Sequence, residues 1–331
     1  MKRVQHSSYG NPSDVVEVVE AEPSEPAEGE AQIAVEASPI RFQDLYTIRG
    51  SKDFRRSLPD CPGGIGIGRI TKVGHAVTNV KPGDREYLRQ VNGAWQDRTV
   101  VPAAGLHRAP DSGDPIQLSV VNSNLITAYG LMKCVVDLEP GEWVLLNAAN
   151  SNCGHVAIQL ARTWGVKTVC VVRRASLAPG LQSLGADAVV VDGPNLAEDV
   201  ARMTGEAKIR LGLDMVAGDA TGRLAECMAE WGTIACYGQV SGDPCSVPAH
   251  LMLFKQLHVV GFLTLAWLAH KGYRKDDVSA VLDELGALVL DGKLVSPIAG
   301  VYSFAEARQA LDHAARSGEG RAGKVILVPH T

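Results

Sequence analysis

The stretch from Glu142 to Phe262 alternates short apolar runs with amphipathic segments. The apolar runs read WVLLNA, KTVCVVR, DAVVVDG, LGLDMVA and GTIACYG, and helix-like segments such as HVAIQLARTWG and LAEDVARMTG lie between them. Several of these segments end at a glycine, as helix C-caps do. Runs that are apolar on both faces and separated by helices are typical of a parallel sheet covered on both sides. The sequence therefore predicts a doubly wound α/β domain over residues 121–264.

The residues before this stretch have a different pattern. DVVEVVEAE and AQIAVEASPI are strand-like runs joined by a Pro/Glu turn, and GIGIGRITKVGHAVTNVKPGDREYL continues with short β-branched runs. Little helical periodicity precedes Ser119. The tail combines two helical segments with a final strand, GKVILVP. We expect a β-rich domain over residues 1–120 that residues 265–331 complete.

Composition excludes several classes of protein. The chain has 331 residues, a net charge of -5 and no basic stretch, which argues against a nucleic-acid partner. Its apolar runs are far shorter than a membrane span, and its N-terminus lacks the apolar segment of a signal peptide. Seven scattered cysteines with no C-x-x-C pair argue against a disulfide framework and a zinc knuckle. We expect a cytoplasmic protein that binds a small-molecule substrate, not a membrane.

The segment NAANSNCG lies where a dinucleotide-binding protein has its glycine-rich phosphate loop. The G-x-G-x-x-G pattern becomes Ala-x-Ser-x-x-Gly, so only the last glycine, which permits close helix–strand packing, is kept. A helix N-terminus binds anions through its N–H groups and dipole, which need no glycine. The residues expected at this phosphate site are Asn150, Ser151, Asn152, Cys153 and Gly154. The alternative is an ordinary capped helix without a ligand.

Two arginines follow the next predicted strand, in VCVVRRAS, about twenty residues after the loop. An NAD enzyme usually has an acidic residue here for the ribose 2′-hydroxyl, whereas Arg173 and Arg174 suit a 2′-phosphate. Lys324 in the last strand is a second candidate cation. The sequence therefore favours NADPH over NADH as the cofactor, although either arginine or the lysine can also be ordinary surface charge.

Nearly the whole chain resembles the medium-chain dehydrogenase/reductase superfamily, through VGHAVTNVKPGDRE, the central nucleotide domain and the terminal GKVILV. The resemblance is greatest to its zinc-free branch of quinone reductases and 2-enoyl thioester reductases. NAANSNCGHVAIQLARTWGVKTVCVVR and LMLFKQLHVVGF are similar to the enoyl reductases in particular. Where zinc members have a Cys and a Gly-His-Glu, this chain has RFQDLY and CPGGIGIG. The resemblance implies a GroES-like catalytic domain, a Rossmann domain, no metal, and a homodimer formed near Gly261–Leu265.

The resemblance also implies catalytic and substrate-binding residues. Tyr46 matches a tyrosine of the quinone reductases within F-x-D-x-Y-x-x-x-G, and a phenol can hydrogen-bond a carbonyl oxygen. The enoyl reductases place their catalytic tyrosine where this chain has Lys52. Either Tyr46 substitutes for it, Lys52 supplies the charge, or the substrate differs. Arg41, where the family has asparagine, can pair a substrate carboxylate or phosphate, or remain a surface arginine.

At the nicotinamide end, Thr127 matches a threonine of this branch, with helix packing as the alternative role. Trp267 is expected to wall the substrate pocket or to be a core tryptophan. The other residues implied to contact the cofactor are Ala217, Gly218, Tyr237, Gly238, Phe262 and Leu263.

The predicted function is zinc-independent reduction, with NADPH, of an activated C=C bond in an enoyl thioester or enone, or of a quinone. Hydride addition to such a bond needs a positioned cofactor and a donor to the developing enolate, and no Lewis acid. Two alternatives stay open. One is a carbonyl or quinone reductase without thioester activity, and the other is a non-catalytic NADPH-binding redox sensor or structural protein.

Overall fold

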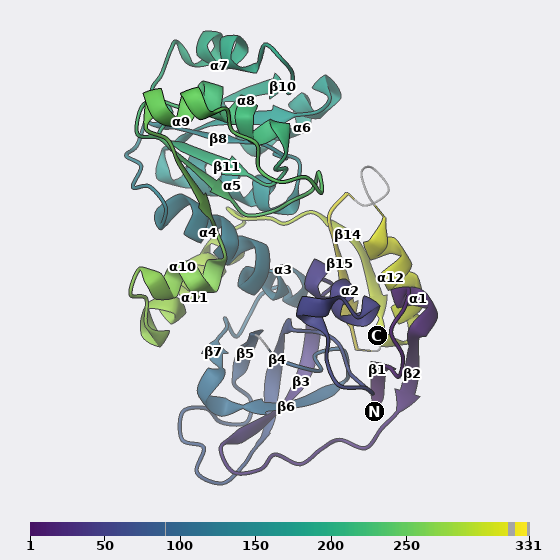
Figure 1. The fold of residues 1–331 in the computed structure, drawn as a ribbon. Coiled ribbons are helices and arrows are strands. Elements are labelled where there is room, and N and C mark those ends of the chain that lie inside the picture. Colours follow the sequence, from purple (N-terminus) through teal and green to yellow (C-terminus); the bar gives the residue numbers. More distant parts are fainter. Residues whose placement is uncertain (90, 317–321, 330–331) are drawn as a thin grey trace. The chain divides into compact units, whose positions relative to one another are not determined.

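A computed structural model describes residues 1–89, 91–316 and 322–329 of the chain (Figure 1). The chain divides into two compact units. Unit 1 comprises Met1–Ser123 and Ser279–Thr331, and unit 2 comprises Asn124–Val278.

Unit 2 contains a six-stranded sheet in the order β10-β9-β8-β11-β12-β13, and all neighbouring strands are parallel. Counted from β8, this order is 3-2-1-4-5-6, which is the order of the dinucleotide-binding Rossmann fold. The prediction of a doubly wound domain is therefore confirmed. The strands are β8 (Trp143–Leu146), β9 (Lys167–Val172), β10 (Ala188–Val191), β11 (Leu211–Asp214), β12 (Thr233–Cys236) and β13 (His258–Gly261).

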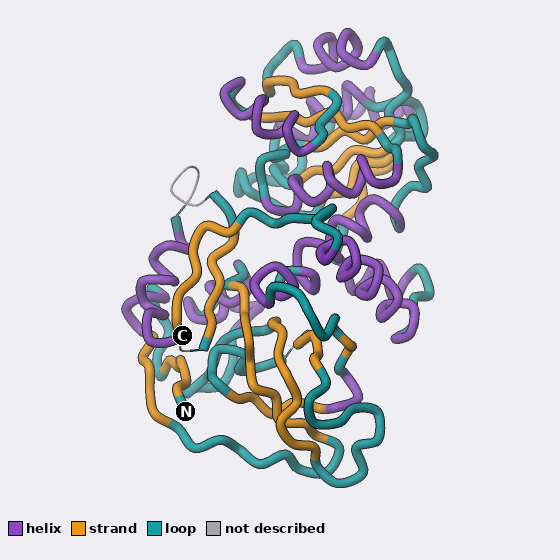
Figure 2. The backbone as a smooth tube through the Cα atoms, turned by 180° about the vertical axis from the view of Figure 1, so that it is seen from behind, coloured by secondary structure: helices purple, strands orange, loops and turns teal. Residues whose placement is uncertain are grey.

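Helices connect these strands and surround the sheet (Figure 2). Since parallel crossovers are right-handed and the chain reverses direction after β10, α5 and α6 cover one face and α7 and α8 the other. The first three of these helices end at glycines with left-handed φ, as expected: Gly165, Gly185 and Gly205. The helices of unit 2 are α4 (Ile126–Lys133), α5 (Asn152–Trp164), η4 (Ala175–Leu177), α6 (Ala178–Leu184), α7 (Leu196–Thr204), α8 (Asp219–Cys227), α9 (Ala249–Lys255) and α10 (Thr264–His270). The chain passes from one unit to the other within η3 (Val121–Leu125) and again within α11 (Lys275–Leu290).

The core of unit 2 lies between this sheet and its helices. Apolar side chains of the parallel strands are buried on both faces of the sheet, which is why the runs read as nearly continuous hydrophobic sequence. Members of this core include Leu145, Val169, Val171, Val190, Leu196, Val200, Leu224, Ile234 and Leu251.

Unit 1 is β-rich. Its larger sheet has the order β14-β15-β3-β4-β5-β7, with β6 also paired to β3, and a two-stranded sheet joins β1 to β2. The last strand, β15, pairs with β3, so the C-terminal segment completes this unit as the sequence predicted. The strands are β1 (Lys2–His6), β2 (Val16–Glu20), β3 (Glu30–Pro39), β4 (Ile65–Val73), β5 (Arg85–Arg89), β6 (Arg98–Pro102), β7 (His107–Arg108), β14 (Ile298–Ser303) and β15 (Lys324–Val328).

Short helices cover this sheet. α12 packs on β14 and β15, and α3 packs on β3 and β4. α2 lies in a segment where the sequence showed little helical periodicity. The helices are α1 (Pro12–Val15), α2 (Phe42–Arg49), η1 (Lys52–Phe54), η2 (Ala103–Gly105), α3 (Pro115–Ser119), η5 (Phe304–Glu306) and α12 (Ala307–Ala315). Their core includes Ile33, Val35, Leu45, Ile48, Leu88, Trp95, Phe304 and Leu311.

The boundaries of the two units differ from those expected at both ends of unit 2, by three residues at Ser123 and by more at Val278. The sequence analysis returned the chain to the β-rich domain at residue 265, whereas residues 265–278 lie in unit 2. The reason is that α10 packs against α4, a helix of the same unit. None of the helices in the described ranges combines the length and apolar character needed to span a membrane.

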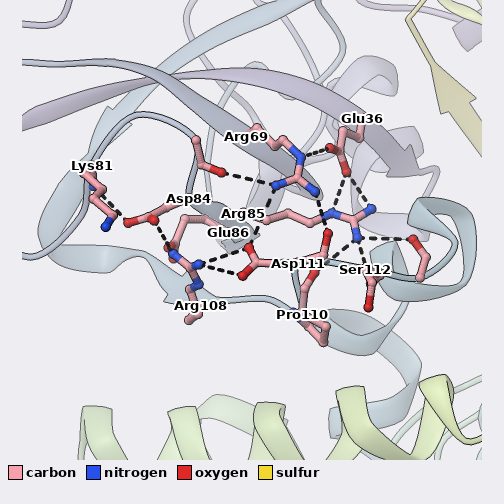
Figure 3. Close-up of polar contacts among 12 residues, drawn as sticks. Glu36, Arg69, Lys81, Asp84, Arg85, Glu86, Arg108, Pro110, Asp111 and Ser112 are labelled. Atoms are coloured by element: carbon pink, nitrogen blue, oxygen red, sulfur yellow. Dashed lines mark hydrogen bonds and ion pairs between the residues drawn. The ribbon is translucent and has the colours of Figure 1, made fainter.

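A charged network joins β3, β4, β5 and β7 in unit 1 (Figure 3). We define it as Glu36, Arg69, Asp84, Arg85, Arg108 and Asp111. The Arg85 guanidinium is buried, pairs with the Glu36 carboxylate at 2.6 Å, and also donates to the carbonyl groups of Pro110, Ser112 and Gly113. The network therefore fastens the loop after β7 to the sheet.

Candidate active site

The sheet of unit 2 has one topological switch point, between β8 and β11. From these neighbouring strands the chain runs to opposite sides of the sheet, so the loops after them separate. Ligands of open α/β sheets bind at such a point, outside the carboxyl ends of the strands. The NAANSNCG loop follows β8, and the LGLDMVA segment ends β11, so both border this position.

Asp214, at the end of β11, is fully buried and organises the loops on both sides of the switch point. Its Oδ1 accepts hydrogen bonds from Asn147 Nδ2, Val216 N and Ala217 N at 2.6, 2.9 and 3.0 Å, and its Oδ2 accepts from Thr221 Oγ1 at 2.5 Å. Asn147 Oδ1 in turn accepts from Met215 N at 2.8 Å. A buried carboxylate is tolerated when several donors satisfy it. Asp214 and Asn147 thus hold the turn after β11 against the loop after β8.

The turn after β11 has an uncommon backbone. Ala217 and Gly218 have φ values of 63° and 61°, in the left-handed region that few side chains adopt. The hydrogen bond from the Ala217 N–H to Asp214 supports this conformation. A Cβ atom at Gly238 would lie 2.8 Å from the Met215 oxygen, so the end of β12 can approach this turn only with glycine. Ala217, Gly218 and Gly238 therefore lie where the turn after β11 and the loop after β12 come close together.

The N-terminus of α5 is capped within the NAANSNCG loop. Ser151 Oγ accepts a hydrogen bond from Gly154 N at 3.1 Å. A Cβ atom at Gly154 would lie 2.4 Å from the Ala149 oxygen, so any larger residue would push the helix away from the loop. This is the close packing expected of the last glycine in the fingerprint. Asn150, Asn152 and Cys153 complete the same loop, with Cys153 buried.

Tyr237 lies at this helix N-terminus. It follows β12, and its hydroxyl is within hydrogen-bonding reach of Ser151 and Cys153. Burial, together with Cys153 and Asp214, raises the pKa of the Tyr237 phenol well above 10, despite the hydrogen bond with Ser151. The hydroxyl is therefore neutral at physiological pH and can donate to an anion. The structure brings Tyr237 together with the predicted phosphate loop.

The two arginines after β9 are both exposed. They occupy the end of the strand next to β8, where dinucleotide-binding domains contact the ribose. Arg173 has no carboxylate partner within the part of the chain that the structure describes. An exposed guanidinium without such a partner is available to a phosphate group.

The residues predicted near the nicotinamide form a second group in unit 2. Thr127 Oγ1 and Thr264 Oγ1 are 3.0 Å apart, which ties α4 to α10. The Phe262 ring is stacked on Trp267, with centroids 5.7 Å apart, while Leu263 is 69% exposed.

Trp267 is half-buried, and its indole Nε1 donates to the Gly261 oxygen at 2.6 Å. Packing accounts for its position in unit 2, and its role against a substrate stays a prediction.

In unit 1, Arg41 is the N-cap residue of α2 and pairs with Asp44. Its Nη2 and Nε lie 2.9 and 3.2 Å from the two carboxylate oxygens of Asp44, which is buried. A Cβ atom at Gly64 would lie 1.8 Å from Arg41 Nη2, so the guanidinium lies directly against the backbone. Its charge is thus already paired within the fold, and a contact with substrate stays a prediction.

Tyr46 belongs to an exposed aromatic stack, which we define as Phe42, Tyr46 and Phe54. The centroid of the Tyr46 ring lies 6.4 Å from that of Phe42 and 5.7 Å from that of Phe54, and the interplanar angles are 30° and 23°. The three side chains are 50%, 41% and 39% exposed in chain order. Lys52 begins η1 and is exposed, and Lys324 begins β15 and is half-buried. Lys324 lies in unit 1, whereas the arginines that it was expected to assist lie in unit 2.

Comparisons with known proteins agree with both units. Residues 27–111 match the model "Alcohol dehydrogenase GroES-like domain", and residues 153–285 match "Zinc-binding dehydrogenase". The mitochondrial enoyl-[acyl-carrier-protein] reductase of Xenopus tropicalis is 28% identical over 301 residues, which are 88% of this chain and 85% of the relative. The human enzyme of that name is 28% identical over 94% of this chain and 85% of its own length.

Solved structures extend this likeness to the fold. The Escherichia coli quinone oxidoreductase complexed with NADPH has a TM-score of 0.83 at 26% identity, over 99% of this chain and 100% of that chain. The Pseudomonas syringae quinone oxidoreductase also has a TM-score of 0.83 at 26% identity, over 99% of each chain. The chain is a medium-chain dehydrogenase/reductase. It is an oxidoreductase enzyme of the zinc-free branch.

For this dehydrogenase/reductase, the residues at the switch point fit a dinucleotide. A capped helix N-terminus, a neutral phenol donor and two exposed arginines form a donor set suited to phosphates. Gly154 and Gly238 keep side chains out of close approaches to the backbone of Ala149 and Met215. Within the described ranges, the one group with the spacing of metal ligands is Asp214, Cys236 and Cys245, which borders the same switch point.

Two residues important to this site were not identified from the sequence. Asn147 and Thr221 hold the Asp214 carboxylate, but they lie 67 and 7 residues from it in the chain. An asparagine at the end of a buried strand was the available signal for Asn147, because a buried amide needs hydrogen-bond partners.

Proposed function

We propose that this dehydrogenase/reductase uses NADPH to reduce an activated C=C bond or a quinone. The observation that carries the choice of NADPH is the pair of exposed arginines after β9, where Arg173 faces no carboxylate among the described residues. A 2′-phosphate provides the missing anion. The similarity to a quinone oxidoreductase that was solved with NADPH supports the same choice.

The residues that would hold the cofactor come from unit 2. The α5 N-terminus, capped by Ser151, and the neutral Tyr237 hydroxyl would hold the pyrophosphate, and Arg173 with Arg174 the 2′-phosphate. Residues of the turn after β11, together with Thr127, Phe262 and Leu263, would border the nicotinamide ribose and ring. NADPH, when bound, supplies the hydride.

Tyr46 would act on the substrate. Reduction of a carbonyl-activated C=C bond places negative charge on the carbonyl oxygen, and a phenol can stabilise that oxygen by donating its hydrogen. The α2 helix presents the Tyr46 side chain on an exposed surface, where a substrate can reach it. The positive ammonium group of Lys52 would also stabilise the negative charge on the carbonyl oxygen of the substrate. The proton that completes the reduction would come from the Tyr46 hydroxyl or from water.

The aromatic stack favours a quinone among the possible substrates. Three nearly parallel aromatic side chains, each more than a third exposed, offer flat surface to a planar ring. An enoyl thioester would instead use its extended acyl chain against apolar side chains. The curated relatives are enoyl reductases, so both substrate classes enter the test.

The test compares a quinone, an enone and crotonyl-CoA with NADPH and with NADH, each with and without a chelator. We expect the highest kcat/KM with the quinone and NADPH, unchanged by the chelator. Turnover confined to crotonyl-CoA would refute the choice of quinone but preserve C=C reduction. Higher kcat/KM with NADH would refute the choice of cofactor.

The role of Tyr46 is tested with Tyr46→Phe, which keeps the ring in the stack and removes the hydroxyl. We expect kcat to fall roughly 10- to 100-fold if one hydrogen bond to the enolate oxygen is lost. Tyr302→Phe is a matched control, because Tyr302 lies on β14, its hydroxyl is hydrogen-bonded to His313 Nδ1 at 2.9 Å, and it takes no part in the site. Wild-type kcat in Tyr46→Phe would remove this residue from the mechanism.

We also propose a homodimer. In the described structure, β13 is the last strand of its sheet and pairs only with β12, which leaves one edge open. Open strand edges are common sites of association. Light scattering should give twice the mass of the 331-residue chain, and a monomer mass at micromolar concentration would contradict the proposal.

A further inference from the structure

Two cysteine thiols meet at the end of β12, beside the Asp214 carboxylate. Cys236 Sγ and Cys245 Sγ are 3.4 Å apart, which is van der Waals contact between the sulfur atoms. The Cys236 thiol also lies 3.8 Å from Asp214 Oδ2. Cys245 is exposed, whereas Cys236 is half-buried beneath it. Neither thiol has a role in the proposed reduction.

Backbone hydrogen bonds bring Cys245 to this position. Residues 237–248 form a long loop between β12 and α9. Three N–H groups of the loop donate to carbonyl oxygens of the turn after β11: Val240 to Met215 at 3.1 Å, Ser241 to Val216 at 2.9 Å and Ser246 to Gly218 at 3.2 Å. The loop is thus fixed on both sides of Cys245, and the meeting of the two sulfur atoms follows from the fold of unit 2.

We propose that Cys236 and Cys245 form a thiol–disulfide site that hydroperoxides oxidise. The sulfur atoms need to approach from contact to the length of an S–S bond, about 2 Å. The fold already supplies the proximity that disulfide formation requires. Such a bond would close a short loop that borders the cofactor edge of the sheet.

A metal ion is a weaker explanation for the same three side chains. The Asp214 oxygens already accept four hydrogen bonds from buried or half-buried donors. A metal would displace part of this arrangement and leave buried donors unsatisfied. Without the carboxylate only two thiolate ligands remain, fewer than a zinc site uses. The geometry therefore favours a bond between the sulfurs.

The exposure of the two thiols sets the order of the steps. A hydroperoxide, ROOH, reaches the exposed Cys245, whose thiolate takes the terminal oxygen to give a sulfenic acid and releases ROH after protonation. Cys236 sulfur then attacks the Cys245 sulfur, the S–O bond breaks, and the hydroxide leaves as water with the Cys236 proton. In sum, two thiols and one hydroperoxide give one disulfide, ROH and water.

Asp214 favours this division of roles. Burial, the Cys245 thiol and the Asp214 charge all raise the pKa of the Cys236 thiol, so Cys236 stays protonated and resists direct oxidation. The nearby carboxylate can pass the Cys236 proton to the departing hydroxide as the S–S bond forms. Cys245 is thus the first thiol oxidised, and Cys236 resolves it.

The disulfide would act on the cofactor edge, a consequence that rests on the proposed function. It would tie the loop to Cys236, the last residue of β12, directly before Tyr237 and Gly238 in the chain. The same loop is hydrogen-bonded to the turn that contains Ala217 and Gly218. Oxidation would therefore reduce the freedom of both segments around a bound NADPH and change its affinity.

The experiment exposes the dilute full-length protein to hydrogen peroxide, blocks remaining thiols by alkylation and maps peptides without reduction. We expect a peptide pair linked through Cys236 and Cys245, a mass lower by two hydrogens, and reversal by dithiothreitol. Cys236→Ser should instead accumulate sulfinic acid at Cys245, and Cys245→Ser should remain reduced at Cys236. Cys227→Ser is the matched control, because that thiol is half-buried in unit 2 and hydrogen-bonded to the Arg223 oxygen.

Three results would overturn the proposal. They are sulfinic acid at Cys245 in the wild type without any cross-link, a disulfide between Cys245 and another cysteine that forms to the same extent in Cys236→Ser, or tightly bound zinc that protects both thiols from alkylation. These readouts need neither substrate nor cofactor. The affinity for NADPH before and after oxidation is a separate measurement, so failure of the proposed function does not affect the thiol result.

Discussion

Charged side chains are used in opposite ways in two regions of this molecule. In the charged network of unit 1, each guanidinium faces a carboxylate: Arg85 and Arg69 contact Glu36 at 2.6 and 3.0 Å, and Arg108 contacts Asp84 at 2.5 Å (Figure 3). At the carboxyl edge of the sheet in unit 2, two charged groups, Asp214 and Arg173, lack such a pairing among the described residues. Neutral groups hold Asp214, and Arg173 has no carboxylate partner in the described structure.

The difference separates structural charges from charges available to a ligand. A guanidinium that already pairs with a carboxylate gains little from a second anion, so the three arginines of the charged network serve the fold. An unpaired, exposed guanidinium gains a phosphate partner at low desolvation cost. Asp214, in contrast, holds the turn after β11 in place, because its carboxylate accepts hydrogen bonds from the backbone N–H groups of that turn. The two regions should therefore respond differently to substitution.

Asp214→Asn should have the largest effect on stability. The amide keeps one oxygen but replaces the other acceptor with a donor, which leaves donors of the turn after β11 without a partner in a buried position. We expect a loss of about 3 kcal/mol in the free energy of unfolding. Calorimetry of the full chain measures the shift in Tm. Asp219→Asn, at an exposed carboxylate five residues further along, is the control and should shift Tm far less.

Replacing Arg173 and Arg174 by alanine should act on cofactor affinity. Loss of charge-assisted hydrogen bonds should weaken NADPH binding roughly 10- to 100-fold and leave NADH binding nearly unchanged. Arg173→Ala alone should leave Tm close to wild type, because Arg173 supports no ion pair of the described fold. Titration calorimetry with both nucleotides measures this, with Arg202→Ala as the control at an exposed, paired arginine. Equal weakening of the two nucleotides would contradict the 2′-phosphate assignment.

The sequence predicted unit 2 better than unit 1 for a physical reason. Buried parallel strands leave a local signature in Leu145, Val169 and Ile234, and glycine marked three helix ends, so the sheet could be expected from neighbouring residues. α2 was hidden because its N-cap is Arg41, which lacks the short side-chain oxygen of usual N-caps, although Gly50 marked its end.

The contacts that build the site were beyond the sequence for another reason. Tyr237 was expected at the cofactor edge, but its contact with Ser151 joins residues far apart in the chain. The Asp214 contact with Asn147 and the pairing of Arg41 with Asp44 likewise depend on tertiary packing and on which of several partners is reached. A sequence motif indicates which residue types lie near a site. The contacts between them can be known only from the positions of the helices and strands in three dimensions.

Arg85→Lys should have an intermediate effect on stability and none on nucleotide preference. A lysine keeps the charge near Glu36 but cannot reproduce the planar fork that also contacts the carbonyl groups of Pro110, Ser112 and Gly113. We expect a loss of about 1–2 kcal/mol. A Tm scan together with the NADPH-to-NADH affinity ratio checks both parts. A change in the NADPH-to-NADH affinity ratio would contradict the distinction between structural and ligand-binding arginines.

Asp84→Asn should have the smallest effect and one that depends on pH. The hydrogen bond from the Arg108 guanidinium is the main reason that the pKa of the Asp84 carboxyl is lowered, helped by the Lys81 N–H, whereas its partial burial acts in the opposite direction. Because the folded-state pKa lies below the unfolded value, the pair stabilises the fold above the unfolded pKa, near pH 4. That contribution is lost as the pH falls through the folded-state pKa.

The Arg108 side chain is 47% exposed, so solvent screening should keep the loss in Asp84→Asn below about 1 kcal/mol at pH 7. Unfolding curves of wild type and variant, recorded between pH 7 and about pH 3, should converge as the carboxyl becomes protonated. A constant difference across this range would mean that Asp84 acts through its shape and hydrogen bonds, not through its charge. High salt should shrink the difference at pH 7, because an exposed ion pair is screened, whereas the buried Asp214 network should be nearly unaffected by salt.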